Sequence, residues 1–359
     1  MAKIIYAVAG EGFGHSSRSH LIGQRLIDCG HDVMFVGSQK SLVYLKQYFG
    51  ERVKDIFGLS FVYENGRVDK SETLRRNLLK IPEANEQNDR LFKQFFEPFK
   101  AELIISDFEP FSAWWAWRNS LPFISIDHEH MLTLCKLEHK SKNWFSRLTA
   151  SVVTECYYVG AVSYIIINFF EAELRIDSAV LAPPIIRPVV RALDGREGEH
   201  ILLYSTSGKG REQLVEILGK FGGQKFYIYG FDEIGEFKNC IFKERSTDGF
   251  LVDLAAARGV IASAGFSLIS ECMHLKKKMC LLPLASQYEQ MINAHYIEKL
   301  GLGISSEKLD EETIERFLDK IDDPVPDNGG IIWPDNDKFF GILQDELNKL
   351  GKPINITAG

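Results

Sequence analysis

The stretch Ser263–Ala294, SAGFSLISECMHLKKKMCLLPLASQYEQMINA, carries most of the information about the fold. It follows the apolar run Gly259–Ala262, which predicts a buried strand, and it places Gly265 where a helix is expected to begin. A second apolar run, Met279–Leu284, predicts the next strand. A strand, a short turn, a helix and another strand in this order are typical of a parallel α/β sheet.

The same stretch contains the groups that a nucleotide-sugar site requires. The first N–H groups of a helix lack intrahelical partners and lie at the positive end of its dipole, so the turn at Gly265 predicts a seat for a diphosphate. Glu271 lies one to two turns further along, within reach of ribose hydroxyls. Glu289 and Gln290 follow the second strand and offer acceptors and donors to sugar hydroxyls. The expected donor contacts are Gly265, Phe266, Ser267, Glu271, Glu289 and Gln290.

This order resembles the C-terminal signature of the GT-B glycosyltransferases, close to the UDP-glycosyltransferases and the lipid-II N-acetylglucosaminyltransferase (glycosyltransferase families 1 and 28). The matching positions are Ala264-Gly265, Glu271, Pro283, Glu289-Gln290 and Asn293-Ala294. The loop departs from the pattern, since the family often has two glycines or His-Gly where this chain has only Gly265. The resemblance implies an α/β fold of two Rossmann-like, doubly wound parallel-sheet domains that face a cleft. It also implies a nucleotide-diphosphate sugar as donor and neither a cofactor nor a metal.

The rest of the chain fits two α/β halves. Apolar runs alternate with helix patterns from Lys3–Ala9 onward, and the alternation resumes at His200–Tyr204. Between them, three prolines within Ala182–Pro188 suit neither a helix nor a central strand. The polar stretch Lys70–Lys100 is expected to be helical and interrupted at Pro82. We expect an N-terminal acceptor-binding domain (1–186), a C-terminal nucleotide-sugar-binding domain (187–334) and a final helix in 335–359 that, by the resemblance, crosses back to the N-terminal domain.

A glycine-rich turn, GEGFGH at Gly10–His15, follows the first predicted strand. It matches the dinucleotide pattern GxGxxG imperfectly, and Val36-Gly37-Ser38 stands where that pattern has an acidic residue, so a dehydrogenase is disfavoured. In the resembled family this loop contacts acceptor and donor, which implies Phe13 as an acceptor contact and Gly14 as a donor contact. The His directly after the loop is the general base in the UDP-glycosyltransferases, and His15 matches that position.

A His base is chemically appropriate for sugar transfer. The acceptor hydroxyl must lose a proton, and a neutral imidazole accepts it efficiently near pH 7. Asp107 ends an apolar run at the carboxyl edge of a predicted sheet, and the resembled family often places an Asp here to pair with the His. The alternatives are that Asp107 caps the following helix and that His15 caps its own turn. Because no nucleophilic carboxylate is identified, we expect one displacement with inversion at the anomeric carbon.

Four further segments contain groups that could belong to a site. The sequence DHEH at Asp127–His130 lacks a third metal ligand, so Glu129 and His130 are expected to contact the acceptor or to be structural. Asp335–Asp337 (DND) resembles the metal-binding Asp-x-Asp of single-domain glycosyltransferases, but it precedes a predicted helix and favours an N-cap. Thr206–Lys209 (TSGK) does not have P-loop spacing, although Ser207 is an expected phosphate contact. In the resembled family the loop at Phe242 holds the nucleobase, so Phe242 is expected either to pack on the base or to belong to the core.

Composition limits the other classes of function. The net charge of −7 argues against nucleic-acid binding, and the six cysteines include no CxxC pair. No secretory pattern is evident, so a cytoplasmic protein is expected. Val152–Phe170 is about as long as a membrane span, but it divides into a buried helix, Ser151–Val159, and a strand, Val162–Phe169. The basic and aromatic residues within Lys140–Arg147 suggest either peripheral membrane contact or a mobile loop.

The function expected from the sequence is transfer of a hexose from a nucleotide sugar, with a UDP-sugar favoured, to a lipid, glycan or small-molecule hydroxyl. Two alternatives remain open. A UDP-N-acetylglucosamine 2-epimerase shares the fold and would use acid–base groups such as His15, Asp107 and Glu129. A non-catalytic nucleotide-sugar-binding protein would keep Glu271 and Gln290 but lose a catalytic His such as His15. This sequence retains His15 and so does not show that loss.

Overall fold

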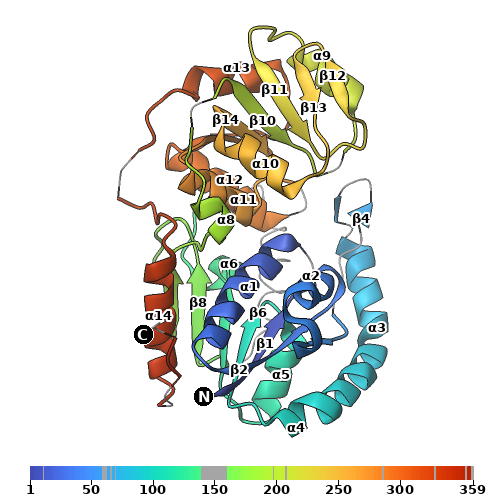
Figure 1. The fold of residues 1–359 in the computed structure, drawn as a ribbon, viewed down its shortest axis with the longest axis vertical. Coiled ribbons are helices and arrows are strands. Elements are labelled where there is room, and N and C mark those ends of the chain that lie inside the picture. Colours follow the sequence, from blue (N-terminus) through green and yellow to red (C-terminus); the bar gives the residue numbers. More distant parts are fainter. Residues whose placement is uncertain are drawn as a thin grey trace. The chain divides into compact units, whose positions relative to one another are not determined.

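The computed structural model describes residues 1–10, 12–58, 63–64, 67–68, 70–138, 160–196, 198–206, 208–284, 287–326, 329–351 and 354–356. Contacts within the chain divide it into two compact units: unit 1 comprises Met1–Arg187 and Asp335–Gly359, and unit 2 comprises Pro188–Pro334. In each unit a central sheet is flanked by helices (Figure 1).

The sheet of unit 1 has seven strands in the order β3-β2-β1-β6-β7-β8-β9, and every neighbouring pair is parallel. A parallel sheet is covered on both faces, which explains why its central strands are continuous apolar runs rather than alternating patterns. These strands are β1 (Lys3–Val8), β2 (Asp32–Gly37), β3 (Val53–Asp55), β6 (Leu103–Asp107), β7 (Phe123–Asp127), β8 (Ser163–Ile167) and β9 (Ala179–Ala182), and a separate hairpin pairs β4 (Tyr63–Glu64) with β5 (Arg67–Val68).

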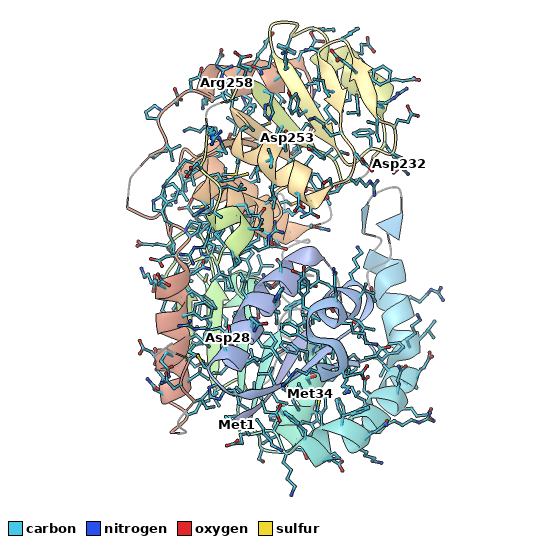
Figure 2. The ribbon with its side chains drawn as sticks, in the orientation of Figure 1. Met1, Asp28, Met34, Asp232, Asp253 and Arg258 are labelled. Carbon is cyan, nitrogen blue, oxygen red and sulfur yellow. The ribbon has the colours of Figure 1, made fainter. Side chains whose placement is uncertain are left out.

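The helices of unit 1 pack on this sheet and bury aliphatic and aromatic side chains, among them Met34 of β2, which is labelled in Figure 2. Phe96, Phe111 and Phe123 belong to the same core. The helical segments are α1 (Phe13–Asp28), α2 (Gln39–Phe49), the 3-10 turn η1 (Gly50–Arg52), α3 (Lys70–Leu91), the π-helical turn η2 (Phe92–Phe96), α4 (Glu97–Phe99), α5 (Pro110–Arg118), α6 (Met131–Leu134) and α14 (Asn336–Asn348).

The expected interruption at Pro82 is wrong, because α3 continues through this exposed residue. A proline inside a helix removes one backbone hydrogen bond, so other contacts must hold the helix together. Ala84, Asn88 and Leu91 are buried on one side of α3. The Asn88 side chain also accepts from the Phe57 N–H (2.8 Å) and donates to the Phe57 carbonyl (3.1 Å). This packing outweighs the local preference of proline.

The strand order of unit 1 places two loops of distant sequence side by side. β1 lies between β2 and β6, so the chain winds outward from β1 in one direction and from β6 in the other. Val8 and Asp107, the last residues of these two strands, are register partners. In doubly wound sheets ligands bind outside the carboxyl ends of the strands at this reversal of strand order.

The chain returns to unit 1 through α14. Asp335 caps this helix, since its carboxylate accepts a backbone N–H at 3.0 Å, as expected for an N-cap. The Asn336 amide accepts from the N–H of Ile186 (2.8 Å) and donates to its carbonyl (2.9 Å). Further along the helix, Glu346 accepts from the Ser163 hydroxyl at 2.8 Å. These bonds tie α14 to the strand and linker residues of unit 1.

The sheet of unit 2 has the order β12-β13-β11-β10-β14-β15-β16, and only the pair of β12 and β13 is antiparallel. Its reversal of strand order lies between β10 and β14, where Tyr204 and Ala262 are register partners. The strands are β10 (His200–Tyr204), β11 (Lys225–Tyr229), β12 (Gly235–Phe237), β13 (Cys240–Phe242), β14 (Gly259–Ala262), β15 (Lys278–Leu281) and β16 (Gly303–Ser305).

The helices of unit 2 are held to the sheet by apolar packing and by single polar contacts. Asp253, which is labelled in Figure 2, accepts a hydrogen bond from the Tyr229 hydroxyl at 2.6 Å. The helices are α8 (Pro188–Arg191), α9 (Arg211–Leu218), α10 (Thr247–Ala255), α11 (Phe266–His274), α12 (Tyr288–Lys299) and α13 (Glu311–Lys320).

Some expectations concern residues outside the described part of the chain. These are the buried helix at Ser151–Val159, the basic and aromatic segment Lys140–Arg147, and Ser207. Within the described part, no helix combines the length and the apolar composition that crossing a bilayer requires.

Candidate active site

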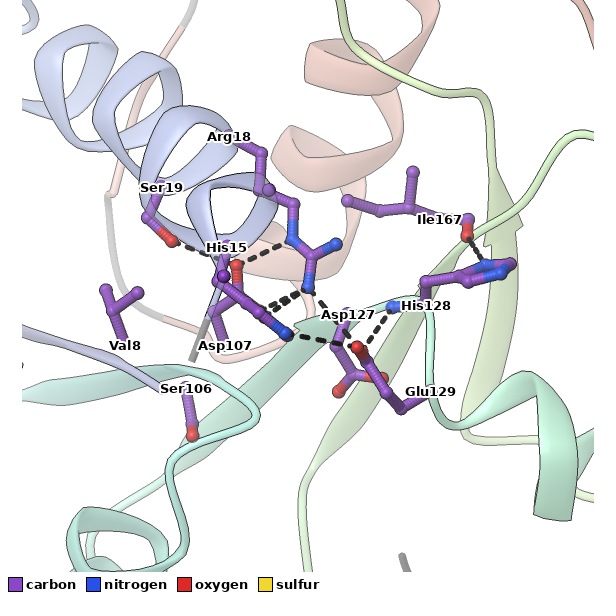
Figure 3. A network of polar contacts seen from close by, with 12 residues as sticks. Val8, His15, Arg18, Ser19, Ser106, Asp107, Asp127, His128, Glu129 and Ile167 are labelled. Carbon is purple, nitrogen blue, oxygen red and sulfur yellow. Dashed lines mark hydrogen bonds and ion pairs between the residues drawn. The ribbon is translucent and has the colours of Figure 1, made fainter. Parts of the chain in front are cut away.

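A tight turn brings His15 to the carboxyl edge of the unit 1 sheet. The turn contains Gly10, where an added Cβ would lie 2.3 Å from the Ser38 hydroxyl oxygen, and Gly12, whose φ is +81°. Both positions therefore require glycine. His15 stands in the first turn of α1, and its Nδ1 lies 2.7 Å from Oδ1 of Asp107 (Figure 3). Because a carboxylate only accepts, Nδ1 donates the proton in this bond.

Asp107 is completely buried, and its carboxylate also contacts Arg18 and Ser19. The Arg18 guanidinium donates to both carboxylate oxygens of Asp107, with Nε 2.6 Å from Oδ2 and Nη2 2.5 Å from Oδ1. The Ser19 hydroxyl donates to Oδ2 at 2.9 Å. Asp107 does not cap the next helix, because Glu109 fills that position and accepts the backbone N–H groups of the first turn of α5. Sequence reasoning missed Arg18 and Ser19, although their spacing of three and four residues from His15 places all three on one side of α1.

Glu129 lies on the Nε2 side of the His15 imidazole. It follows β7, and its Oε1 lies 3.2 Å from Nε2 of His15. Its Oε2 accepts the His128 N–H at 3.1 Å and lies 3.5 Å from Nη2 of Arg18. The Glu129 and His15 side chains are each 15 % exposed, so both retain some access to solvent.

The electrostatics of the cluster favour a protonated His15. Burial disfavours the charged imidazolium, but the carboxylates of Glu129 and Asp107 outweigh burial and raise the pKa of His15 to about 10. Burial also opposes ionisation of Asp107, yet Arg18 and His15 hold its pKa below the usual range. In the same way, His15 and Arg18 hold the pKa of Glu129 well below its usual range against the effect of burial. Glu129 at the second ring nitrogen therefore favours the protonated imidazole over the neutral form that a general base requires.

Phe108 shapes this corner through a constrained backbone. Its φ is +54°, in the left-handed region that residues other than glycine occupy infrequently. Its ring is nearly parallel to the His15 imidazole, at 17° and with the ring centroids 6.4 Å apart. Backbone strain of this kind is often found at functional sites.

His130, an expected acceptor contact, is 4 % exposed and lies below this surface. Its Nδ1 donates to Asp127 at 2.6 Å, and Ser125 donates to the same carboxylate oxygen at 2.6 Å. Of the two roles expected for His130, acceptor contact or structural residue, its burial and these bonds favour the structural one. His128 is also buried and donates from Nδ1 to the Ile167 carbonyl at 2.8 Å. In the described ranges no group of three or more His, Cys, Asp or Glu side chains is arranged to hold a metal ion.

In unit 2 the predicted phosphate turn does precede a helix. Gly265 is the N-cap of α11, with φ −72° and ψ +132°, and an added Cβ there would meet no protein atom within 4 Å. Neither the backbone nor the packing requires glycine at this position, which leaves the space in front of the helix open to a ligand. Glu271, 8 % exposed, lies on the same helix, which begins with Phe266 and Ser267. Asn293 of α12 donates to the Ala264 carbonyl at 3.1 Å and holds the turn in place.

The acid–amide pair begins α12, and its two members differ in their contacts. Glu289 lies in the first turn and accepts from the Asn293 amide at 3.3 Å. Gln290 is 8 % exposed, accepts from the Leu284 N–H at 3.1 Å and donates to the Gln287 side chain at 2.6 Å. Through these bonds Gln290 fixes the Leu284 backbone and the Gln287 side chain, which precede α12.

Phe242 does not face a ligand. It is 1 % exposed and makes edge-to-face contacts with Phe231 and Phe237 in the core of unit 2. It is therefore a core aromatic, because it occupies an inward-facing position of β13. Gly14 lies in the first turn of α1, where its carbonyl accepts from Ser17. The side chain of Phe13 and the whole of Ser207 lie outside the described part of the structure.

The two sheets, each with a reversal of strand order, define a GT-B fold. A family model described as glycosyl transferase family 1 matches residues 2–322, so the chain belongs to that family and is a glycosyltransferase. None of the curated proteins compared with the sequence matches it.

Three solved structures illustrate the similarity of fold. The glycotransferase of kitacinnamycin is 14% identical, covers 90% of this chain and 91% of its own, and has a TM-score of 0.62. CalG4, the calicheamicin glycosyltransferase, is 17% identical with coverages of 89% and 90% and a TM-score of 0.61. LpCGTa in complex with UDP is 14% identical with coverages of 90% and 91% and a TM-score of 0.59.

Proposed function

We propose that this glycosyltransferase takes its sugar from a nucleoside-diphosphate sugar, with a UDP-sugar as the first candidate. Unit 2 binds the donor and unit 1 binds the acceptor. In support, the positive end of the α11 dipole lies behind a glycine turn where an added Cβ would meet no protein atom within 4 Å, an arrangement suited to a diphosphate. Two proteins of similar fold have been solved with nucleoside diphosphates, LpCGTa with UDP and SpnG with thymidine diphosphate.

Within unit 2 we assign the donor contacts along α11 and the start of α12. Glu271 accepts hydrogen bonds from the ribose hydroxyls, and Glu289 accepts from hydroxyls of the transferred sugar. Gln290 shapes the sugar subsite through its hydrogen bonds to Leu284 and Gln287. The remaining proposed donor contacts are Ser207, Gly265, Phe266 and Ser267 of unit 2 and Gly14 of unit 1.

We assign removal of the acceptor proton to His15 of unit 1. The observation that supports this assignment most is the hydrogen bond of His15 to Asp107 at the carboxyl edge of the sheet. The acceptor O–H bond breaks and its proton passes to Nε2, while the oxygen forms a bond to the anomeric carbon. The bond from that carbon to the diphosphate breaks, and its electron pair leaves with the diphosphate. We propose a single displacement with inversion, in which the N-terminus of α11 stabilises the leaving charge without a metal. Glu129 and Phe13 are the proposed acceptor contacts.

A screen tests this function directly. Purified protein is mixed with UDP-, TDP- and GDP-sugars and with lipid, glycan and small-molecule alcohols, and release of the nucleoside diphosphate is measured with and without EDTA. We expect release with one class of donor, no effect of EDTA, and an inverted anomeric configuration of the product by NMR. Release of no nucleotide from any donor, or a product that retains the configuration, contradicts the proposal.

Glu271→Ala is expected to weaken binding of the free nucleoside diphosphate. Removing the carboxylate leaves the ribose hydroxyls without their acceptor, which costs on the order of 1–3 kcal/mol. Isothermal titration with UDP on the folded variant measures the loss, and Glu216→Ala on the exposed side of α9 serves as the matched control. Equal UDP affinity in the wild type and Glu271→Ala removes Glu271 from the site.

Gly265→Ala is expected to weaken UDP binding with little change in stability. The new methyl group meets no protein atom within 4 Å, but it occupies the space that a phosphate would enter. Replacing an N-cap glycine by alanine costs up to about 1 kcal/mol of stability. We therefore expect a melting temperature within a few degrees of the wild type and a UDP affinity reduced by about tenfold or more. A variant with unchanged UDP affinity shows that the diphosphate binds elsewhere.

A further inference from the structure

The charges around His15 are distributed unequally between its two nitrogens. On the Nδ1 side, Asp107 is already paired through both oxygens with Arg18 and receives a further bond from Ser19. On the Nε2 side, the partners of Glu129 other than His15 within the described residues are a backbone N–H at 3.1 Å and the Arg18 guanidinium, 3.5 Å away. Glu129 is therefore the carboxylate whose charge is least compensated without His15.

The surrounding elements supply the remaining ionisable groups. Asp127, the last residue of β7, pairs with His130, and His128 donates to the Ile167 carbonyl. Tyr6 of β1 is completely buried, and burial raises the pKa of its hydroxyl, so it stays neutral. Among the residues that the structure describes, the inner cluster therefore consists of two carboxylates, one guanidinium and the imidazole, and its charges cancel only when His15 is protonated.

The geometry also blocks the atom that the acceptor needs. Deprotonation of an acceptor hydroxyl requires a lone pair on Nε2 and room for the hydroxyl next to it. In the structure the Oε1 atom of Glu129 occupies that place, 3.2 Å from Nε2 (Figure 3). An acceptor hydroxyl and this carboxylate oxygen cannot both occupy the same side of the ring nitrogen.

We propose that Glu129 is a positioning residue that holds a proton on Nε2 of His15 in the free protein and gives up this place when the acceptor hydroxyl arrives. This inference rests on the proposed function, since it assumes that His15 is the base. When the Oε1 atom of Glu129 leaves, the proton on Nε2 passes to solvent, and the freed lone pair accepts the proton of the acceptor hydroxyl. The atom that blocks the base thus becomes available to bind the acceptor.

The first measurement needs no substrate. The protein is labelled with [13C]histidine, and His15 is titrated by NMR in the wild type, Glu129→Gln and the control Glu86→Gln, an exposed pair member on α3. The spectrum of His15→Ala identifies the resonance. We expect His15 to titrate near pH 10 in the wild type and the control. In Glu129→Gln, loss of the neighbouring charge lowers the titration by roughly 1–3 pH units. Identical titration in all three proteins overturns the proposal.

The second measurement is the pH profile of kcat/KM with the donor and acceptor found in the screen. We expect the acidic limb to move to lower pH in Glu129→Gln by about the NMR shift, so that the ratio of activity at pH 7 to activity at pH 9.5 rises. An unmoved limb, in a variant whose melting curve shows it to be folded, overturns the proposal. Wild-type turnover by His15→Ala refutes the base assignment instead, and the substrate-free titration keeps the two failures distinguishable.

Discussion

His15→Ala is expected to lower turnover by roughly 10²–10⁴, the usual contribution of a positioned general base. The alanine variant keeps the sheet and the turn at Gly10, but no group remains to accept the acceptor proton. Donor binding is assigned to unit 2, so the UDP affinity is expected to stay within about twofold of the wild type. Turnover is measured as nucleoside-diphosphate release, and UDP affinity by calorimetry on the same preparations.

The control for this substitution is His20→Ala on the same helix. His20 packs against Tyr44 and Tyr48 on the surface of α1 and α2 and makes no contact with Asp107 or Glu129 among its described interactions. We expect its turnover to resemble that of the wild type. If both histidine variants lose activity equally, the loss reflects damage to α1 and not the removal of a base.

Asp107→Asn is expected to be the most destabilising of the substitutions considered. The structure shows that Asp107 neutralises the buried Arg18 as well as orienting His15, so the variant leaves a guanidinium without its main partner. Breaking a buried ion pair by removing one partner costs roughly 3–5 kcal/mol. Chemical denaturation of unit 1, followed by tryptophan fluorescence, measures the loss. In the fraction that folds, turnover is expected to fall less than in His15→Ala, because the imidazole keeps its place.

A double variant tests the physical reason for this loss. Arg18→Met removes the second charge, so Asp107→Asn combined with Arg18→Met should be more stable than the sum of the single losses predicts. Additive losses show that the two side chains do not interact energetically. A single Asp107→Asn variant as stable as the wild type contradicts the geometry itself.

Much of the fold was predictable from local patterns because parallel strands buried on both faces are continuous apolar runs. The central strands of both sheets follow such runs. The edge strands β3, β9, β12 and β16 were missed, since they are only three or four residues long and partly exposed. The predicted interruption at Pro82 was wrong for the opposite reason, because the tertiary packing of α3 overrides the local preference of proline.

The candidate site was predictable where a motif fixes the position along the chain, and not where a side chain's direction decides its role. Asp107 ends β6, and His15 follows β1, whose last residue Val8 is the register partner of Asp107. Whether Phe242 and His130 face a ligand depends on which side of their segments is buried, and both are buried. The effect of Glu129 on the His15 imidazole was not predictable, because Glu129 is distant in sequence and the fold brings it to Nε2.

Chemical rescue tests the central claim, that His15 is the base, most directly. In His15→Gly, the space left by the ring can admit free imidazole, which can accept the same proton. Turnover is measured at saturating donor with increasing imidazole at several pH values. We predict that the variant starts at least about a hundredfold below the wild type and recovers in proportion to the concentration of neutral imidazole. Turnover that is already close to the wild type without imidazole contradicts the account.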